Sequence, residues 1–470
     1  MQHTDVLDWG AGMNNRYSNK DVDVFAWFRE ASEKGNAYAQ FNLALMYKRG
    51  KGVRRNDAAA FVWMRLSALQ GIAFAQNHLG AMYYNGAGTK PDDAEAVFWF
   101  RMAARQGDAS AQQNLGLMYR KGRGVPRNDE TALTWFCRAA EQGVASAQAL
   151  LGEAYAQGLG TKRNFQLALA WFRKAALQGD ASAQLNLGLM YRRGHGVPQS
   201  DTQAVAWYRQ AAAQGTAAAQ RHLGVAYAEG RGVRVDLERA YSWLRRAAEQ
   251  GDVDAQFNMG VMLSNGYGTH KDEALAFDWY QRAASSGHML AQYNLGGMYA
   301  HGRGVRRDPA EALAWYRKAA DQGAANAQFN VGVIYANGHG VPKDEACAVA
   351  WYRHAAEQGD ASAQNNLGVM YANGQGVLHD DAEAVRWYRR AAEQGHPLAQ
   401  YNLGGMYAGG RGVERDSVLS YMWISLAADA GDETACNNRK LIERKLTREE
   451  IGSAELMTRR WRDAHRTRTV

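Results

Sequence analysis

The residues of this chain best suited to chemistry are twelve histidines and three cysteines, and their spacing does not assemble a reactive site. His301 and His339 come nearest to a metal-ligand arrangement, because they fall in successive glycine loops, but no third ligand stands near them. Cys-x-x-Cys, His-Glu-x-x-His, Gly-x-Ser-x-Gly and Ser-x-x-Lys motifs are absent from the sequence. We therefore expect no catalytic residue, no metal and no cofactor.

The cysteines and the net charge indicate which cellular compartment and which class of partner to expect. Cys137, Cys347 and Cys436 recur at no fixed spacing, so we expect free thiols and a reducing compartment. No leader-like segment opens the sequence, and no stretch approaches the roughly 18 apolar residues of a membrane helix. These features predict a cytoplasmic location without a transmembrane segment. A net charge of +8 over 470 residues fits a solvated surface, and we expect no specific nucleic-acid binding.

A Gly-x-Gly pair recurs eleven times, from Gly50 and Gly52 to Gly410 and Gly412. Glycine-rich loops can cradle phosphate groups, but in such sites a strand precedes the loop, and here none is expected. The recurrence instead indicates turn backbone with positive φ, which glycine adopts without steric cost.

The element that must position every side chain is a 36-residue repeat. Tryptophans mark it without a slip: Trp27, Trp63, Trp99, Trp135, Trp171, Trp207, Trp243, Trp279, Trp315, Trp351, Trp387 and Trp423. A fixed period of this length indicates one supersecondary unit stacked many times, in which each unit buries its apolar face on its neighbours. We therefore predict that the tryptophans pack in the core and do not form a ligand-stacking platform.

One unit, residues 359–395, predicts two helices. Its first half carries apolar residues on one helical face: Ala363, Leu367, Met370 and Tyr371. The loop glycines then end this first helix, called helix A below. Asp380 or Asp381 offers an N-cap for the second, helix B, and Gly395 ends it.

A glycine recurs inside helix A. A glycine at such a position, for example Gly80 or Gly116, costs about 1 kcal/mol relative to alanine, so its recurrence predicts a close helix crossing.

An arginine recurs two residues after most of the tryptophans, for example Arg353. We interpret it as solvated surface that complements the helix dipole.

The consensus A-x-A-Q-x-N-L-G-x-M-Y-x-x-G-x-G-V, then D-x-x-x-A-x-x-W-Y-R-x-A-A-x-Q-G, resembles the Sel1-like repeat, a relative of the tetratricopeptide repeat. The resemblance covers most of the chain and implies an all-α fold, a right-handed α/α solenoid superhelix of about eleven helix-turn-helix repeats with terminal capping helices. It also implies an inner face that binds protein partners. Members of the family are often bacterial adaptors.

The ends of the repeat array predict the domain organisation. Residues 1–20 show no periodicity and are expected to be loosely held, 21–34 should form an N-terminal capping helix, and 35–446 should form the solenoid. Residues 447–470 should form a C-terminal capping helix and tail. Thr447 and Glu450 have the spacing of a capping box, which predicts a last helix over about 448–465.

A row of asparagines and neighbouring aromatic residues on helix A is the candidate partner-binding site. Asparagine donates and accepts hydrogen bonds, which suits an extended peptide backbone. The hypothesis places the site on the inner face of the C-terminal half, at Phe257, Asn258, Tyr293, Asn294, Phe329, Asn330, Asn366, Tyr401 and Asn402. Two alternatives stay open: adjacent repeats cover this apolar face, or each asparagine satisfies a neighbouring loop carbonyl.

The sequence thus predicts a non-enzymatic scaffold or adaptor that binds a partner protein or peptide. The runner-up is a protein that binds or hydrolyses β-lactams, since a cysteine-rich branch of the family is linked to that activity. This chain lacks the cysteine pair per repeat of that branch. A third alternative is a binder of an anionic polymer, with steep salt dependence. The sequence does not predict the partner's identity or the oligomeric state.

Overall fold

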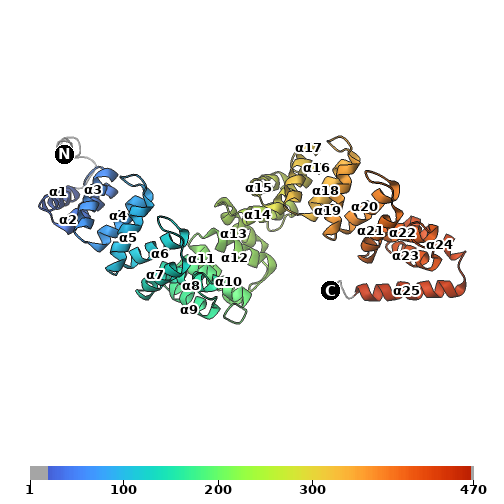
Figure 1. The fold of residues 1–470 in the computed structure, drawn as a ribbon, viewed down its shortest axis with the longest axis horizontal. Coiled ribbons are helices and arrows are strands. Elements are labelled where there is room, and N and C mark those ends of the chain that lie inside the picture. Colours follow the sequence, from blue (N-terminus) through green and yellow to red (C-terminus); the bar gives the residue numbers. More distant parts are fainter. Residues whose placement is uncertain (1–18, 467–470) are drawn as a thin grey trace. The chain divides into compact units, whose positions relative to one another are not determined.

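The computed structural model describes residues 19–466, and within that range every regular element is a helix. The prediction of an all-α repeat fold is confirmed (Figure 1). The chain divides into two compact units, the first ending at Asp236 and the second beginning at Leu237. Each unit is a stack of helix pairs.

The helices of the first unit are α1 (Asn19–Glu33), α2 (Ala37–Arg49), α3 (Asp57–Leu69), α4 (Ala73–Asn85), α5 (Asp93–Arg105), α6 (Ala109–Lys121), α7 (Asp129–Glu141), α8 (Ala145–Gln157), α9 (Phe165–Leu177), α10 (Ala181–Arg193), α11 (Asp201–Ala213) and α12 (Ala217–Glu229). Even-numbered helices are the predicted helix A. Odd-numbered helices from α3 to α23 are the predicted helix B.

The helices of the second unit are α13 (Leu237–Glu249), α14 (Val253–Asn265), α15 (Glu273–Ser285), α16 (Met289–His301), α17 (Pro309–Asp321), α18 (Ala325–Asn337), α19 (Glu345–Glu357), α20 (Ala361–Asn373), α21 (Asp381–Glu393), α22 (Pro397–Gly409), α23 (Ser417–Asp429), α24 (Glu433–Glu443) and α25 (Arg448–Arg466). The long α25 follows the last helix pair.

The helix ends form where the sequence places them. Asp380 caps α21 by accepting a hydrogen bond from the Glu383 amide. Helix A ends at the first loop glycine, as at Gly374, whose φ of 66° lies in the left-handed region. The predicted capping box is also present, because the Glu450 amide donates to Thr447 Oγ1 and the Thr447 amide donates back to Glu450 Oε2.

The second loop glycine has a role that positive φ alone does not explain. A Cβ on Gly88 would lie 2.0 Å from the carbonyl oxygen of Asp57, the first residue of helix B in the preceding repeat. The same clash, at 2.0 Å, would arise between Gly268 and Leu237. Glycine is therefore required here because the loop of one repeat rests on the backbone of its neighbour.

In most repeats, the glycine inside helix A contacts an aromatic ring of the partner helix B. A Cβ on Gly332 would lie 2.6 Å from Cδ1 of Tyr352, the residue after Trp351 in the partner helix B. The predicted close crossing is thus confirmed, and the ring is its cause. The first repeat has a different pair of residues at this contact. Ala44 stands at the glycine position and the flexible Met64 replaces the ring, and both are fully buried.

A ladder of buried glutamines joins successive repeats. Gln292 Nε2 donates to the carbonyl oxygen of Ala284 at 3.1 Å, and Gln292 Oε1 accepts from Gln322 Nε2 at 2.7 Å. The amide therefore bridges the end of the preceding helix B and the end of the following one. Buried amides need such partners, because an unpaired one pays its full desolvation cost.

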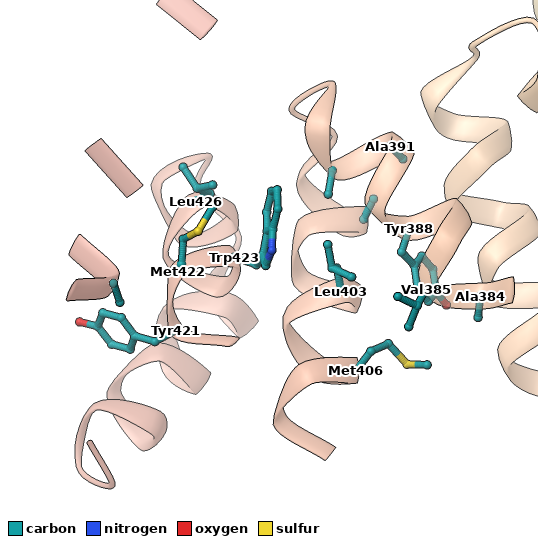
Figure 2. Packing of buried hydrophobic residues seen from close by; sticks show 13 residues of the cluster. Ala384, Val385, Tyr388, Ala391, Leu403, Met406, Tyr421, Met422, Trp423 and Leu426 are labelled. Atoms are coloured by element: carbon teal, nitrogen blue, oxygen red, sulfur yellow. The ribbon is translucent and has the colours of Figure 1, made fainter. Parts of the chain in front are cut away.

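Within each unit, tryptophans pack on the repeat before their own. Trp99 and Trp387 are 8% exposed and join clusters centred on the preceding helices. Figure 2 shows Trp423 between its own helix and the helix that carries Leu403. The core prediction is wrong for Trp27, which is 63% exposed, because no repeat precedes α1 in the described residues.

The first prediction concerns the glycine–ring contact. The substitution G332A should lower the free energy of unfolding by about 1–3 kcal/mol, because the new methyl group must displace the Tyr352 ring. Urea unfolding followed by circular dichroism measures the change. The double variant G332A/Y352M copies the Ala44–Met64 pair and should recover most of the loss. If G332A unfolds like the wild type, the ring does not impose the glycine.

A second prediction follows from a gap in the glutamine ladder. Gln256 Oε1 is buried without a hydrogen-bond partner, since Ser286 replaces the glutamine found at this place in most repeats. S286Q should supply the missing donor and raise the free energy of unfolding by about 1 kcal/mol. The thermal unfolding midpoint measures it. S286A is the control, and an equal rise in S286A would show that the ladder bond is not responsible.

Candidate functional site

Three pockets lie at equivalent places in the second unit, along the side formed by the helices A. Pocket I lies between α14 and α16, pocket II between α16 and α18, and pocket III between α20 and α24. Their volumes are about 280, 490 and 510 Å³ respectively. Each is bounded by the end of one helix A, the ring of the following helix B and the asparagine of the next helix A. We call this side the helix A face.

The wall of each pocket is the same tyrosine whose ring rests on the helix A glycine. Tyr280 lines pocket I, Tyr316 pocket II and Tyr388 pocket III, and all three are buried. Burial raises the pKa of Tyr316 and of Tyr388 to about 12, because the ionised phenol is poorly solvated there. These hydroxyls are therefore neutral donors over the whole physiological pH range.

The predicted asparagines lie near these hydroxyls or bond to a further asparagine. Hydrogen bonding by Asn294 opposes the effect of burial on the pKa of Tyr280, and Asn330 and Asn366 do the same at Tyr316 and Tyr352. Asn402 Nδ2 donates to Asn365 Oδ1 at 3.0 Å. Asn402 thus bonds to a side chain of the neighbouring helix α20, and neither this bond nor the effects on the tyrosines involve a loop carbonyl. An amide with two donors and an accepting oxygen keeps capacity for a ligand after one such bond.

The predicted aromatic row also packs within its own repeat. Ring centroids lie 6.0 Å apart for Phe257 and Tyr280, 5.7 Å for Tyr293 and Tyr316, and 5.8 Å for Phe329 and Tyr352. Phe257, Tyr293 and Phe329 are each partly exposed. The row therefore supports the pocket walls and still presents apolar surface beside them.

The structure groups some predicted residues and leaves others apart. Asn294 lines pocket I, Asn330 lines pocket II, and Tyr401 and Asn402 line pocket III. The remaining predicted residues lie on helices A outside the lining of these pockets: Phe257, Asn258, Tyr293, Phe329 and Asn366. Asn438 extends pocket III, because its Nδ2 donates to the Tyr401 hydroxyl at 2.7 Å.

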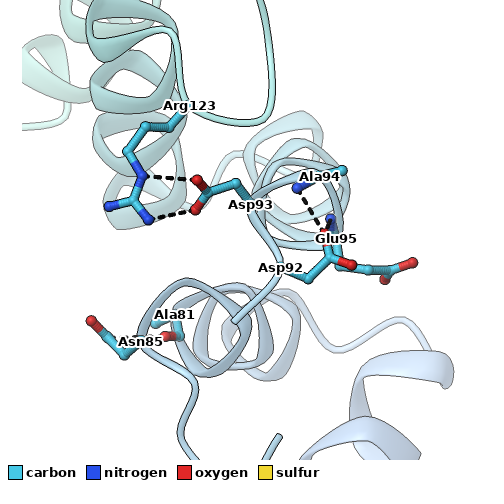
Figure 3. A network of polar contacts seen from close by, with 7 residues as sticks. All are labelled: Ala81, Asn85, Asp92, Asp93, Ala94, Glu95 and Arg123. Carbon is cyan, nitrogen blue, oxygen red and sulfur yellow. Dashed lines mark hydrogen bonds and ion pairs between the residues drawn. The ribbon is translucent and has the colours of Figure 1, made fainter. Parts of the chain in front are cut away.

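The residue between the two loop glycines was not among the predicted site residues. Arg123 forms a two-pronged ion pair with Asp93, at 2.7 and 2.9 Å (Figure 3). The Arg123 guanidinium also lies over the Tyr84 ring. Arg411 pairs in the same way with Asp381, at 2.7 and 3.1 Å, and lines pocket III. In both pairs the carboxylate is the first residue of helix B in the preceding repeat. The constant spacing of 30 residues could have revealed this partner.

The arginine two residues after the tryptophan is exposed in several repeats, as expected, for example Arg353 and Arg389, but it also has a partner that the sequence did not predict. Arg353 donates to the Tyr371 hydroxyl at 2.7 Å, and Arg389 donates to the Tyr407 hydroxyl at 2.7 Å. These tyrosines stand on the next helix A. The arginine thus ties helix B to the following repeat and adds to the structural ladder.

The described residues hold no cluster of three or more histidine, cysteine or carboxylate side chains that could bind a metal ion. Cys137, Cys347 and Cys436 are free thiols. Across residues 19–466, no helix combines the length and apolar character needed to span a bilayer. The pockets themselves are lined by hydrogen-bond donors, aromatic rings and charged side chains.

Comparison with known proteins matches this architecture. The family model of the Sel1 repeat matches residues 25–36, 37–72, 73–108, 109–144, 145–180, 181–216, 217–252, 253–288, 290–323, 325–360, 361–396 and 397–432. The chain is similar to the solved structure of a protective antigen of uropathogenic Escherichia coli strains, with 38% identity, a TM-score of 0.81, and coverage of 93% of this chain and 94% of that one. It is also similar to a Sel1 repeat protein from Oxalobacter formigenes, with 36% identity, a TM-score of 0.50, and coverage of 65% and 91%. No curated protein matches the chain.

The raised pKa of Tyr316 predicts a pH dependence of stability. Its phenol has a pKa of about 12 in the folded protein and about 10 when unfolded, so its contribution to stability is complete below pH 10 and is lost toward pH 12. In Y316F the free energy of unfolding should fall by about 1 kcal/mol less than in the wild type between pH 10 and 11.

Urea unfolding at the two pH values measures this difference, and the comparison of slopes removes any pH-independent effect of the lost hydroxyl. Y267F, which removes an exposed phenol, is the matched control. Identical slopes for Y316F and the wild type would contradict the burial of Tyr316.

Proposed function

The chain belongs to the Sel1 repeat family, and on that premise we propose that it is a non-enzymatic scaffold that binds an extended segment of a partner protein along the helix A face. Sel1 repeats are generally protein-interaction modules. The single observation that carries the proposal is the series of pockets I, II and III at equivalent positions of the repeat.

The repeat geometry suits an extended chain. Packed helices lie about 8–10 Å apart, and an extended peptide rises about 3.3 Å per residue. Successive helices A therefore present equivalent pockets at intervals of roughly three peptide residues. A partner segment could place one side chain in pocket I and another in pocket II while its backbone passes Asn294 and Asn330.

The chemistry of the pockets favours binding over catalysis. Tyr280 and Tyr316 are buried, and burial raises the pKa of both phenols, so both are neutral near pH 7. The best-supported binding residues are the predicted ones that line pockets, namely Asn294, Asn330, Tyr401 and Asn402, together with Arg303 and Arg411 from the loops. The remaining predicted residues, Phe257, Asn258, Tyr293, Phe329 and Asn366, shape the same face. The three free thiols favour a reducing compartment, and we place the adaptor in the cytoplasm.

Gly405 allows a test that does not disturb packing. It is an exposed residue of α22 that lines pocket III, and a Cβ added to it would meet no atom within 4 Å. G405F should fill the pocket, preserve the fold, and weaken binding of partner peptides about tenfold or more. Peptides are first selected from a random display library with the wild-type protein as bait and then measured by fluorescence anisotropy.

The matched control is G452F, since Gly452 is an exposed helical glycine of α25 with equally open surroundings. Peptides that bind wild type and G452F alike but lose affinity for G405F support the proposal. The proposal is wrong if no peptide is selected, or if every selected peptide binds G405F as tightly as the wild type.

A further inference from the structure

Several cations in the loops of this protein are neutralised by carboxylates. Between the loop glycines, Arg123 pairs with Asp93 and Arg411 with Asp381, each carboxylate being the first residue of the preceding helix B, and Arg231 pairs with Glu229. A second cation, two residues before the first residue of helix B, pairs with that residue. Examples of the second kind are Arg55 with Asp57 at 2.9 Å, Arg127 with Asp129 at 2.8 Å and Lys343 with Glu345 at 2.6 Å.

The loop of residues 302–309 forms neither of these two kinds of ion pair. The carboxylate that should pair with Arg303 is Glu273, but it is paired with Lys271 at 2.7 Å. The residue that should pair with Arg307 is Pro309, which carries no charge. Neither arginine has a carboxylate within 4.0 Å among residues 19–466, and both are exposed.

These two arginines line adjacent pockets on the helix A face. Arg303 lines pocket I and Arg307 lines pocket II. Arg303 also reaches α16, where its Nη2 would lie 3.5 Å from a Cβ on Gly297. Valine occupies the corresponding place in neighbouring repeats, at Val261 and Val333, so the glycine gives the guanidinium room on this face.

The surroundings of Arg303 show its charge acting inside the site. Arg303 opposes the effect of burial on the pKa of both Tyr280 and Tyr316, because a nearby cation favours the ionised phenol. Its guanidinium thus acts on the tyrosines of pockets I and II. Positive charge without a carboxylate partner therefore faces the place where the proposed partner segment would lie.

We propose that the helix A face selects an acidic peptide segment, with one Asp or Glu side chain bound by Arg303 and a second bound by Arg307. This proposal rests on the proposed function and adds the chemistry of the partner. Arginine binds carboxylates through two parallel hydrogen bonds, which gives both strength and geometric selectivity. Asp and Glu are the carboxylates that a peptide supplies, and phosphoserine in their place is an outcome of the test below.

The test is a display selection with three baits: wild type, the double variant R303E/R307E and the control R306E. Arg306 lies in the same loop and is exposed, but it lines neither pocket. Wild type and R306E should both enrich peptides in which Asp or Glu recurs at an interval of about three residues. The double variant should lose that enrichment and favour Lys or Arg in its place.

Affinities of the selected acidic peptides then give the size of the effect. R303A and R307A should each weaken binding about tenfold, and R306A should leave it unchanged, because only a charge-assisted bond in a pocket is lost. Circular dichroism checks that each variant is folded. A selected peptide that binds more tightly with phosphoserine in place of glutamate would contradict the carboxylate assignment.

The outcomes separate this inference from the proposed function. If peptides are selected that lose affinity for G405F but show no acidic bias, the face binds peptides and the acidic assignment is wrong. The assignment is also wrong if R306E and R303E/R307E change the bias equally, since the preference would then come from overall charge. If no peptide is selected at all, the proposed function itself fails.

Discussion

The contact on which the rest of this structure depends is the close packing of a helix B side chain, in most repeats an aromatic ring, against a glycine inside helix A. At Gly332 the nearest ring atom of Tyr352 would lie 2.6 Å from an added Cβ, so the two helices approach as closely as backbone and ring permit. Glycine in a helix interior destabilises the helix by about 1 kcal/mol relative to alanine, but it permits this close approach. The buried glutamine ladder and the loop glycines then fix one repeat on the next.

The same ring connects the fold to the candidate site. One end of Tyr316 lies on the glycine of α16, while its hydroxyl faces Asn330 of α18 in pocket II. The tyrosine and asparagine positions common to pockets I, II and III therefore build the pocket walls. The parts that vary, such as Gly297 and the loop cation Arg303, decide what each pocket accepts. Stability and specificity are in this way divided between different positions of one 36-residue unit.

Much of the fold followed from the sequence, because period, helical faces and caps are local patterns. The pairs of helices, the cap at Asp380 and the close crossing at the helix A glycine were predicted from spacing alone. The side-chain partners between repeats were not, since they depend on where a side chain points after two helices have packed. Asn402 bonded to Asn365 and Arg353 bonded to Tyr371 belong to this class. The exposure of Trp27 was missed because a repeat pattern contains no information on its own first member.

The measurement that tests the central claim most directly is site-specific photocrosslinking of a selected peptide. Benzoylphenylalanine is placed at residue 441, where it replaces an exposed leucine of α24 that lines pocket III, and separately at residue 350, an exposed position of α19 on helix B. We predict that the peptide crosslinks at 441 and not at 350, and that excess unlabelled peptide abolishes the product. Crosslinking at 350 with none at 441 would contradict this, because the partner would then occupy the opposite helices.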